Sequence, residues 1–286
     1  MTGPEKTRRQ PHEGRCDTSM DTSCPCPGQS KGHVDTTYLG TVQELLNSFK
    51  RLTYEEMRVQ PGQKILDVGC GPGTDTIPLA QRVGPSGRVI GVDSDAEMIA
   101  EAEKRALKAE VGAWVIHKQA DAIALPFESG WFDACRCERL FEHLHDPEKA
   151  LSEMARVAKS GGRILALDSD WGSLSIDTNE IEAERRYARF FGEHMANNGY
   201  SGRRLYRMFK QQGLLDVTAQ MCGVPFTDYA LARQVMIMDR FEPQAVASGV
   251  VTAQDLDRLH ASWEQANADG AFFASMSMIL VSGRKP

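Results

Sequence analysis

The stretch Lys64–Ala80, KILDVGCGPGTDTIPLA, decides the fold of this chain. A short apolar run carries one acid, Asp67, near its end. Three glycines then stand at alternate positions: Gly69, Gly71 and Gly73. Glycine lets the backbone turn tightly and approach a ligand closely. The pattern predicts a buried strand over residues 64–69, a ligand-binding turn, and a helix over residues 73–83.

The glycine turn differs from the two common phosphate-binding loops. The dinucleotide fingerprint needs a glycine where this chain has Thr74, and the P-loop needs a Gly-Lys-Ser/Thr that is absent. A carboxylate at Asp67 would repel a pyrophosphate and attract an ammonium group. Asp93 ends the next predicted strand, where an acid accepts hydrogen bonds from a ribose diol. The two acids favour a ligand with both an amino acid and a nucleoside, and S-adenosylmethionine is such a ligand.

Strands and helices alternate on both sides of this turn, which predicts βαβ units in a parallel sheet. Further strands are expected at residues 88–94, 114–121, 131–138, 163–170, 214–222 and 272–285. Ser94 and Glu97 have the spacing of a capping box at the start of one helix, and Pro147 suits the first turn of another. We therefore expect an α/β fold with a doubly wound, mostly parallel seven-stranded sheet. Helical segments at 173–212 and 226–268 would form a cap and a second insertion.

The N-terminal part of the chain divides into two segments. Residues 1–33 are nearly free of large apolar side chains, and such a segment cannot offset its ordering entropy by burial, so we expect a disordered tail. Residues 34–60 have apolar residues at helical spacing, and the main domain would cover residues 61–286.

Composition excludes several classes of function. The chain has 33 basic and 39 acidic residues and a formal net charge of −6, with no basic block, which argues against a nucleic-acid partner. No apolar run reaches the roughly 18 residues that span a bilayer, and no signal peptide is visible, so we expect a cytoplasmic protein without membrane insertion. The seven cysteines suggest reduced thiols. Cys24 and Cys26 lack a second ligand pair at a zinc spacing, so we predict no metal site.

Five segments together resemble the class I S-adenosylmethionine-dependent methyltransferases, most nearly the ubiquinone/menaquinone-biosynthesis (UbiE-like) type. They read LDVGCGPGTDT, VIGVDSDAEMIAEAEKRA, QADAIALPFESGWFDA, ERLFEHLHDPEKALSEMARVAKSGGRILALD and the terminal VSGRKP. The resemblance covers about residues 60–170 and the last strand. It implies a Rossmann-like fold, S-adenosyl-L-methionine as methyl donor and S-adenosyl-L-homocysteine as product.

The resemblance also implies roles for particular residues. Asp67 and the three glycines would hold the methionine part of the cofactor, and Asp93 would take the ribose hydroxyls. Further cofactor contacts are implied for Ser94, Met98, Asp121, Ala122, Arg139 and Tyr38. Ordinary structural interpretations stay open: Asp67 as a turn cap, the other acids as strand ends, Met98 as core. The helix around Tyr38 would either close over the cofactor or pack elsewhere.

Methyl transfer is an SN2 displacement, so the protein mainly holds the nucleophile, methyl and sulfur in line and excludes water. A base is needed only where the acceptor must lose a proton. The candidate catalytic residues are His143, Glu138 and Asp170. His143 could instead bond the backbone at a helix start. An aromatic acceptor pocket is expected from Trp171, Tyr187, Phe191, His194 and Tyr206.

Six arginines in the predicted cap have two interpretations: they pair with an anionic acceptor or they form a solvated face. They are Arg185, Arg186, Arg189, Arg203, Arg204 and Arg207. The solvated face is the simpler interpretation.

The function expected from these observations is methyl transfer to a carbon or oxygen nucleophile of a small molecule, such as a natural-product intermediate of secondary metabolism. Two alternatives stay open. One is a methyltransferase acting on a peptide or protein carboxylate. The other is a non-methylating relative that binds the cofactor and catalyses a rearrangement or acts as a regulatory partner. The expected partners are a small-molecule methyl acceptor and a second copy of the chain in a homodimer.

Overall fold

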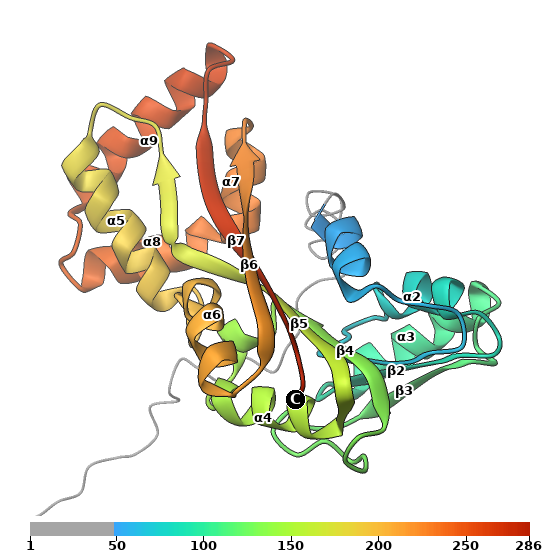
Figure 1. Ribbon diagram of the computed structural model, residues 1–286. Coiled ribbons are helices and arrows are strands. Elements are labelled where there is room, and N and C mark those ends of the chain that lie inside the picture. Colours follow the sequence, from blue (N-terminus) through green and yellow to red (C-terminus); the bar gives the residue numbers. More distant parts are fainter. Residues whose placement is uncertain (1–48) are drawn as a thin grey trace, which may run out of the picture. The chain divides into compact units, whose positions relative to one another are not determined.

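The fold is built on a seven-stranded sheet with the strand order β3-β2-β1-β4-β5-β7-β6 (Figure 1). The computed structural model describes residues 49–286. The expected tail, Cys24, Cys26 and Tyr38 lie outside the described residues. The sheet confirms the predicted doubly wound, mostly parallel class of fold.

The first half of the sheet is parallel. Its strands are β1 (Lys64–Val68), β2 (Arg88–Asp93), β3 (Val115–Gln119), β4 (Phe132–Glu138) and the first part of β5 (Ala158–Ile176). β7 (Ala274–Arg284) runs antiparallel between β5 and β6 (Leu215–Phe226). β1 lies between β2 and β4, so the strand order reverses there, and ligands of such sheets bind at the carboxyl ends of the strands at this point.

Helices pack on both faces of the sheet. Their bounds are α2 (Thr76–Val83), α3 (Ala96–Lys108), η1 (Phe141–His143), α4 (Pro147–Val157), α5 (Ile181–His194), α6 (Ser201–Gln211), α7 (Tyr229–Met236), α8 (Met238–Ala247) and α9 (Ala253–Ala268). Neighbouring residues of β1 point to opposite faces, so Ile65 packs with Leu79 of α2 while Leu66 packs with Leu151 of α4 and Leu205 of α6. α6 thus packs on a face of the sheet.

Two expectations on local structure were wrong. Asp95, not Ser94, is the N-cap of α3, and its carboxylate accepts the backbone N–H groups of Glu97 and Met98 at 2.8 and 3.4 Å. An aspartate caps at least as well as a serine, and here it stands one residue nearer the helix. β5 also continues to Ile176, beyond the expected end at residue 170, because β7 resumes its antiparallel pairing at Ser175 after a register shift.

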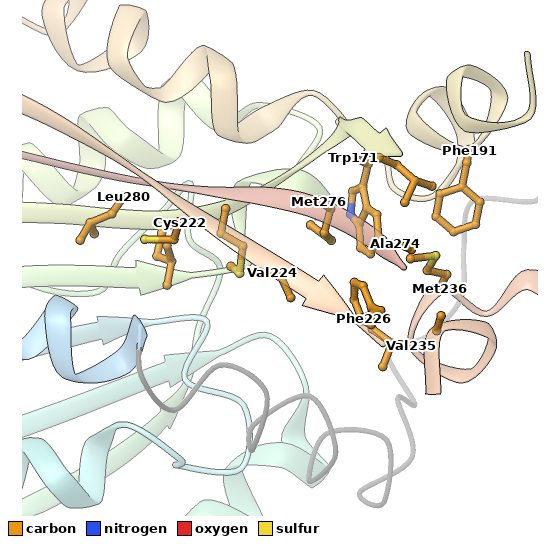
Figure 2. Close-up of a cluster of buried hydrophobic side chains, with 14 of the residues drawn as sticks. Trp171, Phe191, Cys222, Val224, Phe226, Val235, Met236, Ala274, Met276 and Leu280 are labelled. Atoms are coloured by element: carbon orange, nitrogen blue, oxygen red, sulfur yellow. The ribbon is translucent and has the colours of Figure 1, made fainter. Parts of the chain in front are cut away.

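The hydrophobic cluster that contains Ile65 and Leu79 continues where β5, β6 and β7 extend beyond the parallel strands. Figure 2 shows Trp171 of β5, Phe226 of β6 and Met276 of β7 with Phe191 of α5 and Met236 of α7 in one buried cluster. Aromatic rings of α5, α7, α8 and α9 continue this cluster. Burial of these rings holds the four helices on the strand extensions.

Candidate functional site

The glycine turn follows β1 at the point where the strand order reverses. Gly69, Gly71 and Gly73 have positive φ angles of 71°, 50° and 77°, a region that favours glycine. The backbone N–H groups of Gly69 and Cys70 donate to the Val92 oxygen at 2.8 and 3.0 Å. A Cβ at Gly73 would lie 3.0 Å from the Ala102 Cβ of α3. The turn is therefore tied to β2 and packed closely on α3.

Asp93 at the end of β2 faces this turn. Its carboxylate accepts the Gly71 N–H at 2.9 Å through Oδ2 and the Asp95 N–H at 3.0 Å through Oδ1. A carboxylate oxygen has two lone pairs, so each oxygen can still accept from one hydroxyl. The position and the acceptor capacity fit a ribose diol.

Asp67 lies beneath the turn with one carboxylate oxygen left without a partner. The residue is 2% exposed, and Oδ1 is 3.4 Å from Nη1 of Arg136. Oδ2 is buried and has no hydrogen-bond donor. Burial raises the pKa of the Asp67 carboxyl to about 7, and Arg136 offsets only part of this effect. A buried carboxylate oxygen without a donor suits a positively charged ligand group.

Arg136, fully buried in the middle of β4, is the centre of an ion network. Its guanidinium lies 2.9 Å from Asp75 and 2.8 Å from Glu138, and the Lys50 ammonium also contacts each of these two acids at 2.8 Å. The Tyr54 hydroxyl donates to Asp75. These cations hold the pKa of Asp75 below its ordinary value despite burial.

The network has two cations and three carboxylates, counting Asp67. It therefore lacks one positive charge when all three acids are ionised, and the unpartnered Asp67 oxygen marks where that charge belongs. The α-ammonium of S-adenosylmethionine fits this requirement.

Sequence reasoning missed Lys50, Tyr54, Asp75 and Arg136. Two signals were present: an arginine in the middle of a predicted strand, and a second acid, Asp75, two residues after the last glycine. Lys50 and Tyr54, in the helix of residues 49–57, gave no signal because their role depends on tertiary packing.

The residues expected near adenine stand at the carboxyl ends of β2 and β3. Met98 in the first turn of α3 is half-buried and lies outside the buried core, while Ser94 is exposed. Asp121 is exposed and accepts the Ile123 N–H at 3.1 Å, and Ala122 is buried. The Ala120 N–H donates to the backbone carbonyl oxygen of Asp93 at 2.9 Å and ties the two strand ends together. Their contacts with adenine stay predictions.

Two of the three candidate catalytic residues are held in ion pairs. Both oxygens of Glu138 are engaged by Lys50 and Arg136. Both oxygens of Asp170 accept from Nε of Arg203 at 2.8 and 2.9 Å. Neither carboxylate is free to take a proton without breaking its pair.

His143 is the candidate with an accessible ring. Its side chain is 63% exposed, and Nε2 lies 3.5 Å from Oε1 of the buried Glu142. The other oxygen of Glu142 accepts the indole N–H of Trp171 at 2.8 Å. Asp168 is fully buried beside Glu142. Burial and the nearby Glu142 carboxylate raise the pKa of Asp168 well above its ordinary value. The imidazole therefore lies beside a buried acid, and within residues 49–286 its ring forms no hydrogen bond with the backbone.

The five residues expected in an acceptor pocket do not all meet. Trp171, Phe191 and Tyr187 form a chain of rings with centroid separations of 5.6 and 6.1 Å, and Figure 2 shows the first two inside the buried cluster. His194 is exposed and stacks on Phe190, and Tyr206 is exposed on α6. Of these three rings, Tyr187 and Phe191 are fully buried and support the position of Trp171. Contact with an acceptor stays a prediction for all five.

Four of the six cap arginines pair with acids of the protein itself. Arg185 pairs with Glu184, Arg186 with Asp255, Arg189 with Glu193 and Arg203 with Asp170. These pairs agree with the simpler interpretation of these arginines.

Within residues 49–286 there is no group of three or more His, Cys, Asp or Glu side chains placed to hold a metal ion. The helices of this part of the chain are too short or too polar to cross a bilayer.

The strand order and the site at the end of β1 define the class I methyltransferase fold. The solved structure of the YcgJ protein from Bacillus subtilis superposes with a TM-score of 0.60 and 24% identity, over 84% of this chain and 98% of that chain. This likeness shows the fold.

Sequence relatives extend the match. Residues 65–162 match the family described as methyltransferase domain. The ubiquinone/menaquinone biosynthesis C-methyltransferase UbiE of Enterobacter sp. (strain 638) is 32% identical, over 63% of this chain and 74% of that protein. An uncharacterized 37.1 kDa protein in transposon TN4556 of Streptomyces fradiae is 36% identical, over 82% of this chain and 66% of its own length, just under two thirds. The chain belongs to the class I S-adenosylmethionine-dependent methyltransferases, which confirms the resemblance seen in the sequence.

Proposed function

We propose that this chain transfers the methyl group of S-adenosylmethionine to a carbon or oxygen nucleophile of a small molecule, in the cytoplasm and as part of secondary metabolism. The observation that carries the proposal is the unpartnered Asp67 oxygen beneath the glycine turn, in a buried network short of one positive charge. Kinship with a C-methyltransferase of quinone biosynthesis supports the choice of a small-molecule acceptor.

Residues of the chain would divide the work of binding. Asp67 would accept from the ammonium group of the cofactor, and the backbone of the glycine turn would lie against its methionine part. Asp93 would accept from the ribose hydroxyls while it holds the Gly71 N–H. When bound, the cofactor supplies an electrophilic sulfonium methyl.

His143 would act as the base where the acceptor is a hydroxyl or an acidic carbon. The acceptor atom would form its bond to the methyl as the methyl–sulfur bond breaks, with the electron pair left on sulfur. The acceptor's proton would pass to Nδ1 of His143, because Nε2 faces Glu142 and carries the proton of the neutral ring. Glu142, 3.5 Å from Nε2, would stabilise the imidazolium that results. Trp171 holds Glu142 from the other side.

The experiment that tests the proposal is transfer of a labelled methyl from S-adenosylmethionine into a metabolite extract of the source cells, followed by fractionation. Label in the small-molecule fraction is the expected result, and mass spectrometry would then identify the acceptor. Label in the protein fraction would favour the carboxylate methyltransferase of peptides or proteins. Tight cofactor binding without any transfer would favour the non-methylating relative. A homodimer stays a prediction, tested by light scattering of the same sample.

A further inference from the structure

Arg139 has an unusual backbone at the centre of the candidate site. It follows the last residue of β4, and its φ of 49° is left-handed. Its N–H donates to the Leu167 oxygen at 2.8 Å, so it lies where β4 and β5 leave each other. The next residue, Leu140, fills the space beside Gly69 of the glycine turn. A left-handed arginine costs energy, and such conformations cluster at functional sites.

The side chain of Arg139 is also unsatisfied. It is half-buried, and its Nε atom is buried without a hydrogen-bond acceptor. No acid among residues 49–286 forms an ion pair with its guanidinium. A buried donor left unmade costs more than an average hydrogen bond contributes, and more so for a charged group.

Carboxylates are plentiful at these strand ends, yet each is engaged elsewhere. Glu138 is shared by Lys50 and Arg136, and Asp170 is held by Arg203. Glu142 accepts from Trp171 and faces His143, and Asp168 accepts the backbone N–H groups of Glu142 and Ser169. In the described part of the chain the Arg139 guanidinium is therefore the open charge at the carboxyl ends of β4 and β5.

We propose that the Arg139 guanidinium binds an anionic oxygen of the methyl acceptor, so that the enzyme selects acceptors that carry a carboxylate or a phosphate. An arginine presents several N–H donors in a planar fork that matches either group. This inference rests on the proposed function and adds the class of substrate. It assigns Arg139 to the acceptor, whereas the family resemblance implied a contact with the cofactor.

The test uses the full chain and a metabolite extract divided by anion exchange into an anionic and a neutral fraction. Each fraction is supplied with labelled S-adenosylmethionine and with wild-type protein, Arg139→Asn or Arg139→Lys. Asparagine tolerates a left-handed backbone, so Arg139→Asn removes the guanidinium with little backbone strain. Arg240→Asn, at an exposed arginine of α8, is the matched control. Calorimetry with S-adenosylhomocysteine checks that each variant is folded and binds the cofactor.

We expect label in the anionic fraction, a loss of roughly 10- to 100-fold in kcat/KM for Arg139→Asn, and partial recovery in Arg139→Lys. Cofactor affinity should stay at the wild-type value. Phosphatase treatment then separates the two sources: loss of the label from the anionic fraction indicates a phosphate, and retention a carboxylate.

Three results would overturn the inference alone. They are label only in the neutral fraction, full turnover in Arg139→Asn, and weaker S-adenosylhomocysteine binding in Arg139→Asn, which would place the guanidinium on the cofactor. No label from wild-type protein in either fraction would overturn the proposed function and this inference together.

Discussion

Replacement of Arg136 by methionine is the sharpest test of the buried network. The guanidinium is fully buried, 2.8 Å from Glu138, 2.9 Å from Asp75 and 3.4 Å from Asp67. Arg136→Met keeps most of the side-chain volume and leaves three buried carboxylates facing the single ammonium of Lys50. Removal of one partner from a buried ion pair costs about 3–5 kcal/mol because the remaining charge is uncompensated. That is a large share of the roughly 5–15 kcal/mol by which a domain is stable.

The same reasoning gives the loss of stability a pH dependence. Without the guanidinium, the pKa of the carboxyl of Asp67, already raised to about 7 by burial, should rise further. Protonation of Asp67 at lower pH removes the uncompensated charge. The loss of stability in Arg136→Met should therefore be smaller at about pH 5.5 than at about pH 7.5.

Urea unfolding followed by circular dichroism at the two pH values measures the effect. The control is Arg163→Met, which breaks a partly exposed pair with Glu56 at 3.2 Å and should cost about 1 kcal/mol or less. A loss at pH 7.5 no larger in Arg136→Met than in this control would refute the reasoning. So would a loss that is the same at both pH values with an unchanged m-value.

The remaining predictions concern the cofactor, the stability of the free protein and the base. Because the proposed contact with the ammonium group needs an ionised Asp67, affinity for S-adenosylhomocysteine should increase about tenfold for each unit of pH increase up to about 7 and then level off. Calorimetry, corrected for ligand ionisation, should find this dependence absent in Asp67→Asn. In the free protein the free energy of unfolding has the opposite pH dependence. The folded-state pKa of Asp67 is raised, so its contribution to stability is present below about pH 4 and is lost as the pH rises through about 7. Asp93→Ala should weaken S-adenosylmethionine binding by about 1–3 kcal/mol, and unchanged affinity in a folded variant would remove the ribose contact. His143→Ala should lower turnover without weakening cofactor binding, and full activity in this variant would exclude His143 as the base.

The sequence by itself determined the class of fold and the positions of the acids and glycines that are proposed to hold the cofactor. Both are local signals: glycines that turn a strand into a helix, an acid before them, and an acid at the end of the next strand. Asp67 and Asp93 lie where the pattern predicts because the backbone of each βαβ unit places them there. The hydrophobic pattern along the chain located the seven strands, because the alternation of apolar strands with amphipathic helices is a short-range property of the sequence.

Tertiary structure decided which charges are paired and which are open. Glu138 and Asp170 had the type and position of catalytic acids, but Lys50 and Arg203 approach them from distant parts of the chain and engage both. The N-cap of α3 is Asp95 and not the expected Ser94. Both residue types cap helices well, and the backbone around them decides which one does so. Charge pairing is a long-range property, in which the cost of burial is balanced by partners brought close only by folding. The one strand-end charge at β4 left without such a partner in the described chain, Arg139, could be recognised only after every neighbouring carboxylate had been placed.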